Sequence, residues 1–348
     1  MYTDNLKWKG FITLYVDVRR VQITGGSSFM VTLPKDWANS IGLKKNDSVG
    51  LQSQPDGSLV IFPQGTRKVA ERSAKSIDVD RIPSREYLYR LLVGSYIAGH
   101  REIELRSSGQ LSSLVAGVAA SFTQTAIGLE IMDESESRIL IKDLVDQNEM
   151  QPSKSLERMR VLIKNLLSDV LDDAEAGHKN LYDGLHERDR EIDRLDWLIS
   201  RQVNIFQKEF TLARKVGTDL TSVTRTSIAS RAMERIGDHV LQVAKNFGIL
   251  LSEPDTSEFI EEAVSIGREA NECVSVAVTN YLKKDVQKAN DCIMESERIV
   301  ERTESLSRIS VDLGQNASIS SGMIAGSLRR IAEYAMDLSE LAINAAMD

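Results

Sequence analysis

The residues of this chain best suited to chemistry are pairs of carboxylates spaced four positions apart. Two such pairs are repeated about one hundred residues further along the chain, which is the signature of an internal repeat. In chain order the pairs are Asp189/Asp193, Glu234/Asp238, Glu297/Glu301 and Glu333/Asp337. Each pair lies in a helical sequence pattern, so its two acids share one helix face and repel each other mildly.

A bound cation or a partner arginine would remove that repulsion, and the residues leave both alternatives open. Carboxylates converging from facing helices form the all-oxygen sites that Mg²⁺, Mn²⁺, Ca²⁺ or oxidised iron prefer. The alternative is a solvated charged face, because arginines lie near every pair, at positions 188, 190, 194, 231, 235, 298, 302, 329 and 330. His239 follows Asp238 directly but points about 100° away on a helix, so it is not counted as a ligand.

No constellation of an enzyme stands out in the sequence. The four histidines are scattered, and the HExxH, GxSxG and GxxxxGK[ST] motifs do not occur. The Gly25–Ser28 stretch lies between two strand patterns and is interpreted as a hairpin turn. We therefore expect a protein that is not an enzyme. Phosphatase turnover or metal storage is the weakest alternative, because no nucleophile or histidine-containing metal site accompanies the acids.

Cysteine use and hydropathy give an expected compartment. Cys273 and Cys292 are the only cysteines and form no CxxC motif, which is typical of reduced thiols in a cytoplasmic protein. No run approaches the roughly 20 apolar residues of a membrane span. We expect a cytoplasmic protein without direct membrane insertion.

The charge of the chain is divided unevenly. Residues 1–68 contain nine basic and five acidic residues, whereas the whole chain has a net charge of −8. A basic head on an acidic body is typical of a small nucleic-acid-binding domain joined to another function.

Strand and helix signals divide the chain into four parts. Residues 1–68 follow a ββαββ order, with strands over Val18–Ile23, Phe29–Leu33, Ser48–Ser53 and Ser58–Phe62 and a helix over Lys35–Ile41. A domain this small buries little core, so we expect a homodimer or higher oligomer. Residues 78–150 read as a connecting α+β domain of order αβαββ. The rest reads as two three-helix repeats, 154–252 and 256–348, broken at Pro254.

The C-terminal repeats resemble the PhoU family of phosphate-uptake regulators. Glu234-Arg-Ile-Gly-Asp238-His239 is the closest local match, and Asp189–Asp193 also fits the E(D)xxxD pattern of that family. Glu297–Glu301 has Glu where Asp is usual, and Glu333–Asp337 lacks the Arg-Ile-Gly filling. The resemblance implies a six-helix body with bound iron, zinc or related metals, manganese and magnesium included. It also implies a phosphate ABC transporter or a sensor kinase as a partner.

Residues 18–63 resemble the SpoVT/AbrB (MazE-like) swapped-hairpin domains. The match rests on Val21–Ser28, on Val31–Lys35 and on Ile41–Asp47. The resemblance implies dimerisation by interlaced strands and DNA binding by one basic face. By this resemblance, Arg19, Arg20 and Lys35 would bind DNA, and Gln22 would contact a base. Such a domain can also serve as a dimer clasp alone.

The combined prediction is a mainly α multidomain protein that regulates phosphate uptake. The AbrB-like head would bind DNA, and the PhoU-like body would sense metal–phosphate status or a transporter component. The alternative is a helical adaptor that does not bind DNA and acts by protein contacts on the transporter or the kinase.

Overall fold

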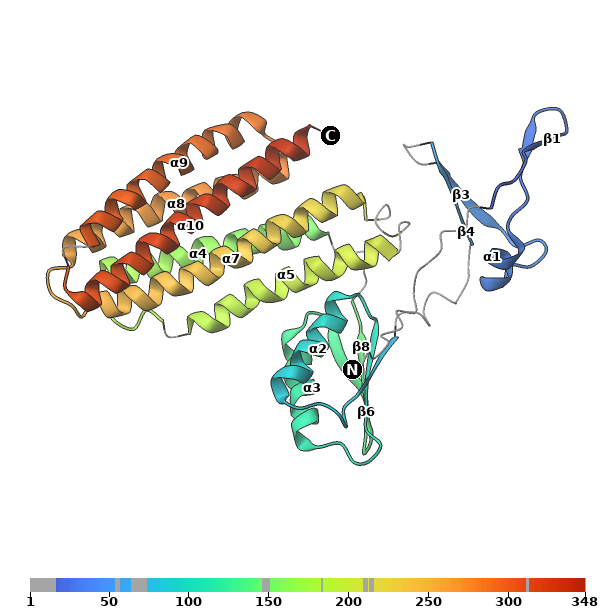
Figure 1. Ribbon diagram of the computed structural model, residues 1–348, viewed down its shortest axis with the longest axis horizontal. Helices are drawn as coiled ribbons and strands as arrows, with labels where there is room; N and C mark the ends of the chain where they lie inside the picture. The colour runs from blue at the N-terminus through green and yellow to red at the C-terminus, as the bar shows by residue number, and fades with distance from the viewer. Residues whose placement is uncertain are drawn as a thin grey trace, which may run out of the picture. The chain divides into compact units, whose positions relative to one another are not determined.

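The computed structural model describes residues 17–53, 57–63, 74–145, 151–182, 184–208, 212, 216–310 and 313–347. The chain folds as two compact units, Met1–Arg72 and Ser73–Asp348, and most of its regular structure is helical (Figure 1). The predicted mainly α, multidomain fold is therefore confirmed, and each unit is described separately below.

The N-terminal unit follows the predicted ββαββ order. Strands β1 (Gln22–Thr24) and β2 (Ser28–Met30) form an antiparallel hairpin, helix α1 (Lys35–Ser40) follows, and β3 (Val49–Ser53) pairs with β4 (Leu59–Pro63). Gly25 and Gly26 have φ values of 63° and 86°, so the first turn needs residues without a Cβ. These are two separate two-stranded sheets.

The described residues of the first unit form no apolar core within one copy. No hydrophobic side chain of its described residues is fully buried, and Val21, Phe29 and Leu51 are 63%, 78% and 64% exposed. Strands β1 and β2 are exposed along their whole length. Isolated two-stranded hairpins with bare apolar faces are marginally stable at best, so these strands need further surface to pack against.

The second unit begins with a small two-layer domain. The element order is β5 (Ala74–Asp78), α2 (Arg85–Ile97), β6 (Glu102–Arg106), α3 (Ser113–Thr125), β7 (Leu129–Ser135) and β8 (Arg138–Asp143). The sheet order is β5-β6-β8-β7, with β5 parallel to β6 and the other pairs antiparallel, and both helices lie on one face of the sheet (Figure 1). The αβαββ prediction omitted β5.

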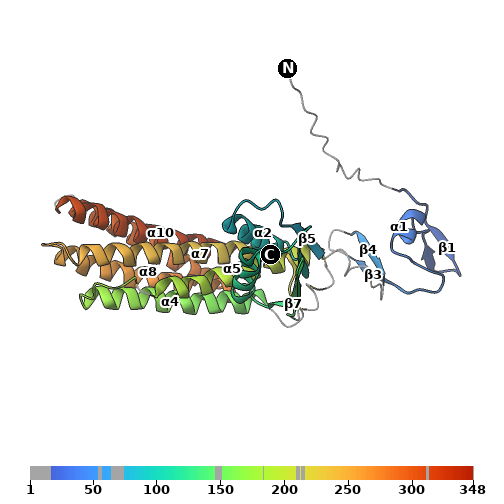
Figure 2. The same ribbon diagram turned by 90° about the horizontal axis from the view of Figure 1, so that it is seen from below.

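The helical body contains α4 (Pro152–Glu175), α5 (Leu185–Lys208), α7 (Leu220–Leu250), α8 (Ser257–Lys283), α9 (Val286–Ile309) and α10 (Gln315–Ala346). Three of these helices precede the predicted break at Pro254 and three follow it. The first three and the last three each pack together, and α4–α8 and α7–α10 contacts join the two groups (Figure 2). One apolar core runs through both groups. None of the described helices is both long and apolar enough to span a membrane.

Helix α5 fastens the small α+β domain to the helical body. The last carbonyl groups of a helix have no partners within that helix, and side chains of α5 supply donors to those at the end of α2. Arg201 donates to the carbonyl oxygens of Tyr96 and His100, and its guanidinium also pairs with Asp143 at 2.6 Å. Trp197 of α5 packs against the apolar core of this domain.

Two further side chains of the same α5 face extend this contact. The Asn204 amide donates to the Ile97 carbonyl at 3.0 Å, and the Lys208 ammonium donates to the Ala98 carbonyl at 2.6 Å. Gly99 follows with a φ of 85°, and a Cβ there would stand 2.9 Å from the Ile205 side chain. The close approach of α5 therefore requires glycine at position 99.

Breaking the buried pair should destabilise this contact. Arg201 and Asp143 are 1% and 3% exposed, so Arg201→Ala would leave a buried carboxylate without its cation. We expect a loss of about 3–5 kcal/mol in the free energy of unfolding, measured by urea denaturation. Arg188→Ala, which removes a more exposed pair with Asp169, is the control and should cost under about 1 kcal/mol. Equal effects of the two substitutions would contradict this view of the contact.

Candidate functional site

Four of the predicted acids come together in the first three-helix group. Asp189 and Asp193 lie on α5, Glu234 and Asp238 lie on α7, and the two helices are in contact. Asp189 is buried and Asp193 and Glu234 are partly buried, whereas half of the Asp238 side chain is exposed. The cluster therefore opens to solvent on the Asp238 side.

Nearby arginines do not neutralise the α5 acids. Among the described residues, neither Asp189 nor Asp193 has an ion pair or a hydrogen bond to its side chain. Arg188 instead pairs with Asp169 at 2.7 Å, and Arg194 pairs with Glu191. The sequence left a choice between arginine pairing and a shared cation, and for these two acids the arginines are engaged elsewhere.

Burial and mutual repulsion change the titration of these acids. Burial, together with the charges of Asp238 and Glu234, raises the pKa of Asp189 to about 6. Burial also raises the pKa of Asp193 to about 6, the charges of Asp189, Asp238 and Asp196 add to it, and the charge of Arg231 opposes it. The pKa of Glu234 is raised by burial as well, against the opposing effect of Arg231. The cluster is thus a place where negative charge is costly and a cation would be favourable.

Residues around the cluster hold its α7 side in position. Asp196, a buried acid that the sequence analysis did not include, accepts a hydrogen bond from Ser230 at 2.7 Å. Arg231 bridges Asp196 and Glu234 at 3.4 and 3.1 Å. The Glu234 Oε2 atom is buried and accepts no hydrogen bond from the described residues. The Arg235 Nε atom lies 3.6 Å from that oxygen and forms an ion pair with it.

Gly237 allows α5 and α7 to approach each other at the cluster. A Cβ at this position would stand 3.0 Å from Asp189 Oδ1 and 3.3 Å from the Ile192 side chain. The Arg-Ile-Gly filling of the motif therefore has a structural reason, since the glycine leaves room for the Asp189 carboxylate.

The donor set suits a hard cation, although its side chains are not in a coordinating arrangement. In the part of the chain that the structure describes, no group of three or more His, Cys, Asp or Glu side chains is placed to hold a metal ion. The cluster nevertheless offers what such an ion needs: carboxylate oxygens from two helices, raised pKa values and a buried oxygen without a donor. Metal binding here stays a prediction.

The four acids of the second group are not brought together in the same way. Glu297, Glu301 and Asp337 are exposed. Glu333 is held by Arg329 at 2.9 Å and Arg330 at 2.5 Å. These arginines lower the pKa of Glu333 although partial burial acts to raise it. In the second group, therefore, Glu333 is neutralised by arginines and the other three acids are exposed, whereas the first group holds Asp189 and Asp193 away from solvent without an ion pair to the described residues.

The buried faces of α5 and α9 explain this difference. The buried positions of α5 have the same 4-3-4-3 spacing as buried positions of α9, in which Cys292, Ser296, Ile299, Thr303 and Leu306 correspond to Leu185, Asp189, Ile192, Asp196 and Ile199. Ser296 therefore takes the place of Asp189, and Glu297 lies one position further along, toward solvent.

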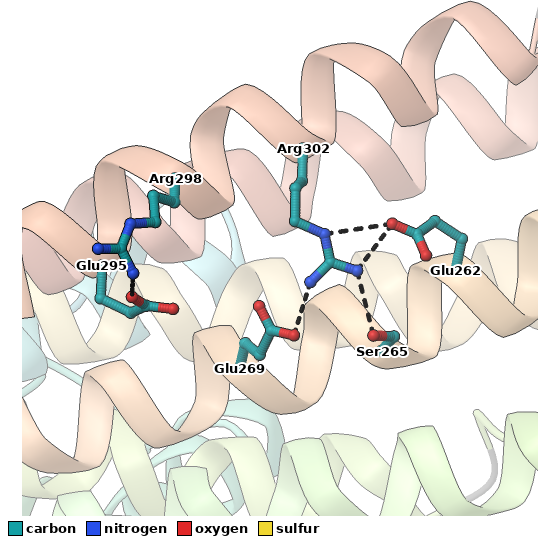
Figure 3. A network of polar contacts seen from close by, with 6 residues as sticks. All are labelled: Glu262, Ser265, Glu269, Glu295, Arg298 and Arg302. Carbon is teal, nitrogen blue, oxygen red and sulfur yellow. Dashed lines mark hydrogen bonds and ion pairs between the residues drawn. The ribbon is translucent and has the colours of Figure 1, made fainter.

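Two arginines of α9, close to Glu297 and Glu301 in the sequence, bind other acids (Figure 3). Arg302 of α9 reaches across to α8, where it pairs with Glu262 at 2.7 Å and Glu269 at 2.6 Å. Arg298 pairs with Glu295 at 2.5 Å within α9. The two ion pairs of Arg302 therefore join α8 to α9.

The predicted DNA-binding residues lie on the surface of the first unit. Arg19 and Arg20 precede β1, Gln22 begins it, and Lys35 begins α1; all four are exposed. Arg19 pairs with Asp17 at 2.5 Å, so part of its charge is compensated. DNA binding by these residues stays a prediction.

Comparison with known families supports both resemblances. Residues 22–69 match the family model described as "Antidote-toxin recognition MazE, bacterial antitoxin", and residues 156–247 match the PhoU domain. The second match contains α5, most of α7 and all four acids of the first cluster. No curated protein matches the chain significantly.

Solved structures show the same fold for the helical body. A crystal structure of PhoU from Pseudomonas aeruginosa aligns with a TM-score of 0.50 and 18% identity, over 56% of this chain and 95% of that one. The phosphate transport system regulatory protein PhoU from Streptococcus pneumoniae aligns with a TM-score of 0.43 and 20% identity, over 56% and 92%. At 18% identity the first alignment supports the fold alone.

The raised pKa values predict an unusual pH dependence of stability. Since the pKa of Asp189 and Asp193 rises from 3.8 to about 6 on folding, the folded state binds more protons between these values. The contribution of these two acids to the stability of the metal-free protein should therefore fall as pH rises from about 4 to 6. Asp189→Asn/Asp193→Asn should be more stable than wild type at pH 7.5 and should gain nothing at pH 4.

The control is Glu297→Gln/Glu301→Gln, which removes two exposed acids of the same spacing and should leave the curve unchanged. Thermal unfolding in a chelator across this pH range measures the effect. If the Asp189→Asn/Asp193→Asn variant were less stable than wild type at pH 7.5, the conclusion that these acids repel each other in the folded state would be wrong.

Proposed function

We propose that this protein is a dimeric, DNA-binding regulator of phosphate homeostasis whose helical body responds to cations and phosphate. The observation that carries the proposal is the carboxylate cluster between α5 and α7, in which Asp189 and Asp193 have no ion pair with the described residues, inside the segment that matches the PhoU domain. The MazE-like segment on the same chain would supply a basic surface for DNA.

Asp189, Asp193, Glu234 and Asp238 would hold the cation. A cation bound there would offer open coordination positions to phosphate oxygens, which need no glycine-rich loop. The protein side chains contribute the rest: Asp196 and Arg231 orient Glu234, and Gly237 leaves room for Asp189. Iron, zinc, manganese and magnesium are all compatible with oxygen donors, so the donor set does not choose among them.

The bare apolar surface of the first unit supports dimerisation. Phe29 and Leu51 are 78% and 64% exposed, and the apolar residues around them include Val21, Ile23, Met30, Val31, Leu59 and Val60. A second copy carrying the same two hairpins would cover these faces and pair the edges of the strands. Dimerisation would also place two copies of Arg19, Arg20, Gln22 and Lys35 on one assembly.

Regulation would be possible if the dimer had two arrangements of its helical bodies that bind DNA with different affinities. A cation, phosphate or partner that binds one arrangement of the helical bodies more tightly shifts the dimer toward it. The spacing of the two basic faces then changes, and DNA affinity changes with it.

The second candidate is an adaptor that works by protein contacts alone. The pairing of Arg19 with Asp17 favours it, because a compensated arginine contributes less to phosphate contacts. In that case the first unit is a dimer clasp, and a phosphate transporter or a sensor kinase is the partner.

DNA binding across a salt series tests the proposal. The full-length protein should bind the DNA upstream of its phosphate-transport genes with an affinity that falls steeply with salt. Arg19→Ala/Arg20→Ala should weaken binding at least tenfold at constant salt, as expected from two lost phosphate contacts. The matched control is Arg158→Ala, an exposed arginine of α4, which should leave the affinity unchanged.

The same assay separates the two candidates. Specific binding that depends on added Mn²⁺ or phosphate in wild type, but not in Asp189→Asn/Asp193→Asn, would support the regulator. Binding no stronger than to random DNA would contradict it and favour the adaptor.

A charged substitution on the exposed strand face tests dimerisation. Phe29→Glu should raise the dimer dissociation constant at least tenfold, because it places a charge inside an apolar interface. Ile319→Glu, on a 64% exposed position of α10, is the control. Analytical ultracentrifugation measures both, and an unchanged dimer in the Phe29 variant would show that another surface holds the copies together.

A further inference from the structure

A groove of about 640 Å³ runs between α7 and α10 on the surface of the helical body. The two helices pack side by side and run in opposite directions (Figure 1). The rings of His239 on α7 and Tyr334 on α10 are 6.1 Å apart. About three turns further along, Ile228 and Asn344 line the same groove. None of the four acids of the first cluster lines it, so the groove is a separate feature of the molecule.

The two walls of the groove carry charges of opposite sign. Arg231 and Arg235 line the α7 wall, and their side chains are 54% and 51% exposed. Asp337 and Glu340 line the α10 wall, and both are exposed. Among the described residues, neither of these acids has an ion pair or a hydrogen bond to its side chain. The acidic wall therefore has no bound cation from the described part of its own copy.

Apolar side chains line the groove between the charged walls. Ile228 is 53% exposed, and Tyr334 and Leu341 are partly buried. Apolar surface with a charged rim is typical of a place where another protein surface binds. An occupant that fits this groove must cover the apolar residues and present acids to α7 and cations to α10.

A second copy of the chain has this distribution of charge. A twofold axis along the groove places α7 of each copy over α10 of the other, and each residue keeps its level along the axis. Since His239 is beside Tyr334 and the helices are antiparallel, Arg235 is about level with Asp337 and Glu340. The arginine of one copy would therefore face the two acids of the other, and the same contact would occur twice.

The same charges exclude the other twofold arrangement. An axis across the groove would place α7 over α7 and α10 over α10, so arginines would face arginines and acids would face acids. Like charges brought together in an interface are repulsive. Charge complementarity thus selects both the occupant and its orientation.

We propose that the α7–α10 groove is an interface between two copies of this chain, in which Arg235 of one copy pairs with Asp337 and Glu340 of the other. This interface is additional to the contact of the first units. The residues that line the groove are fewer than the roughly 20–30 a side of a standard interface. The contact is therefore weak by itself, and it gains occupancy when the first units hold two copies together. Its strength, but not its existence, rests on the dimer proposed above.

Charge reversal in the full-length chain tests the proposal. The background is Phe29→Glu, which weakens the contact of the first units and leaves the groove as the remaining interface. In this background Glu340→Arg sets two cations against each other across the interface and should raise the dimer dissociation constant at least tenfold. Arg235→Glu should do the same by setting acid against acid; it leaves Glu234 its ion pair with Arg231. Analytical ultracentrifugation measures both.

Mixing the two variants makes the result specific to an interface between copies. In the mixed dimer, Arg235 of the Glu340→Arg chain faces Glu340 of the Arg235→Glu chain, and the two substituted side chains also face each other with opposite charge. The mixture should associate at least tenfold more tightly than either variant alone. Glu261→Arg, which makes the same charge change at an exposed position of α8, is the control and should leave the dissociation constant unchanged. Circular dichroism confirms that each variant is folded.

The proposal is overturned if Phe29→Glu chains stay monomeric at every concentration, or if Glu340→Arg and Arg235→Glu leave their association unchanged. It is also overturned if the mixed variants associate no more tightly than each does alone. The test separates this interface from that of the first units. A dimer that is unchanged by Phe29→Glu but dissociated by Glu340→Arg would support the groove and exclude the first units as the main contact.

Discussion

Helix α5 is the element on which the rest of the second unit depends. One part of it carries Asp189, Asp193 and Asp196 toward α7, and the next turns carry Arg201, Asn204 and Lys208 toward the end of α2. The carbonyl end of α2 has unpaired acceptors and a negative dipole, and α5 supplies the donors and the positive charge. Because a helix is rigid over this length, a shift of α5 at the carboxylates is also a shift at the small domain.

The two three-helix groups share a fold and differ in how they balance charge. The first leaves Asp189 and Asp193 without cations while Arg188 and Arg194 bind other acids. The second neutralises Glu333 with two arginines and turns Glu297 to solvent. One group thus retains a costly concentration of negative charge, a feature that perturbed acids at binding sites share, whereas the acids of the other are exposed or held by arginines.

Local signals made much of this architecture predictable. Pro254 marked the break between the two three-helix repeats, and the Gly25–Ser28 stretch marked the turn of the first hairpin. Strand β5 was missed because Ala74–Asp78 does not alternate and pairs in parallel with a strand about 25 residues away.

The site was partly predictable for similar reasons. Two acids four positions apart lie on one helix face, but the sequence does not say whether that face packs against another helix. For this reason the sequence pattern selected Glu297, whereas the buried position of α9 that corresponds to Asp189 is its neighbour Ser296. Arg201 acquires its role from partners far along the chain, which no local pattern shows.

Proton release on cation binding is the measurement that tests the central claim most directly. Isothermal titration of Mn²⁺ into the metal-free protein, in two buffers of different ionisation enthalpy, gives the number of protons released. The account predicts release at pH 6, where Asp189 and Asp193 are partly protonated, little release at pH 8, and loss of binding in Asp189→Asn/Asp193→Asn. Binding that is unchanged in this variant, or that releases no protons at pH 6, would contradict it.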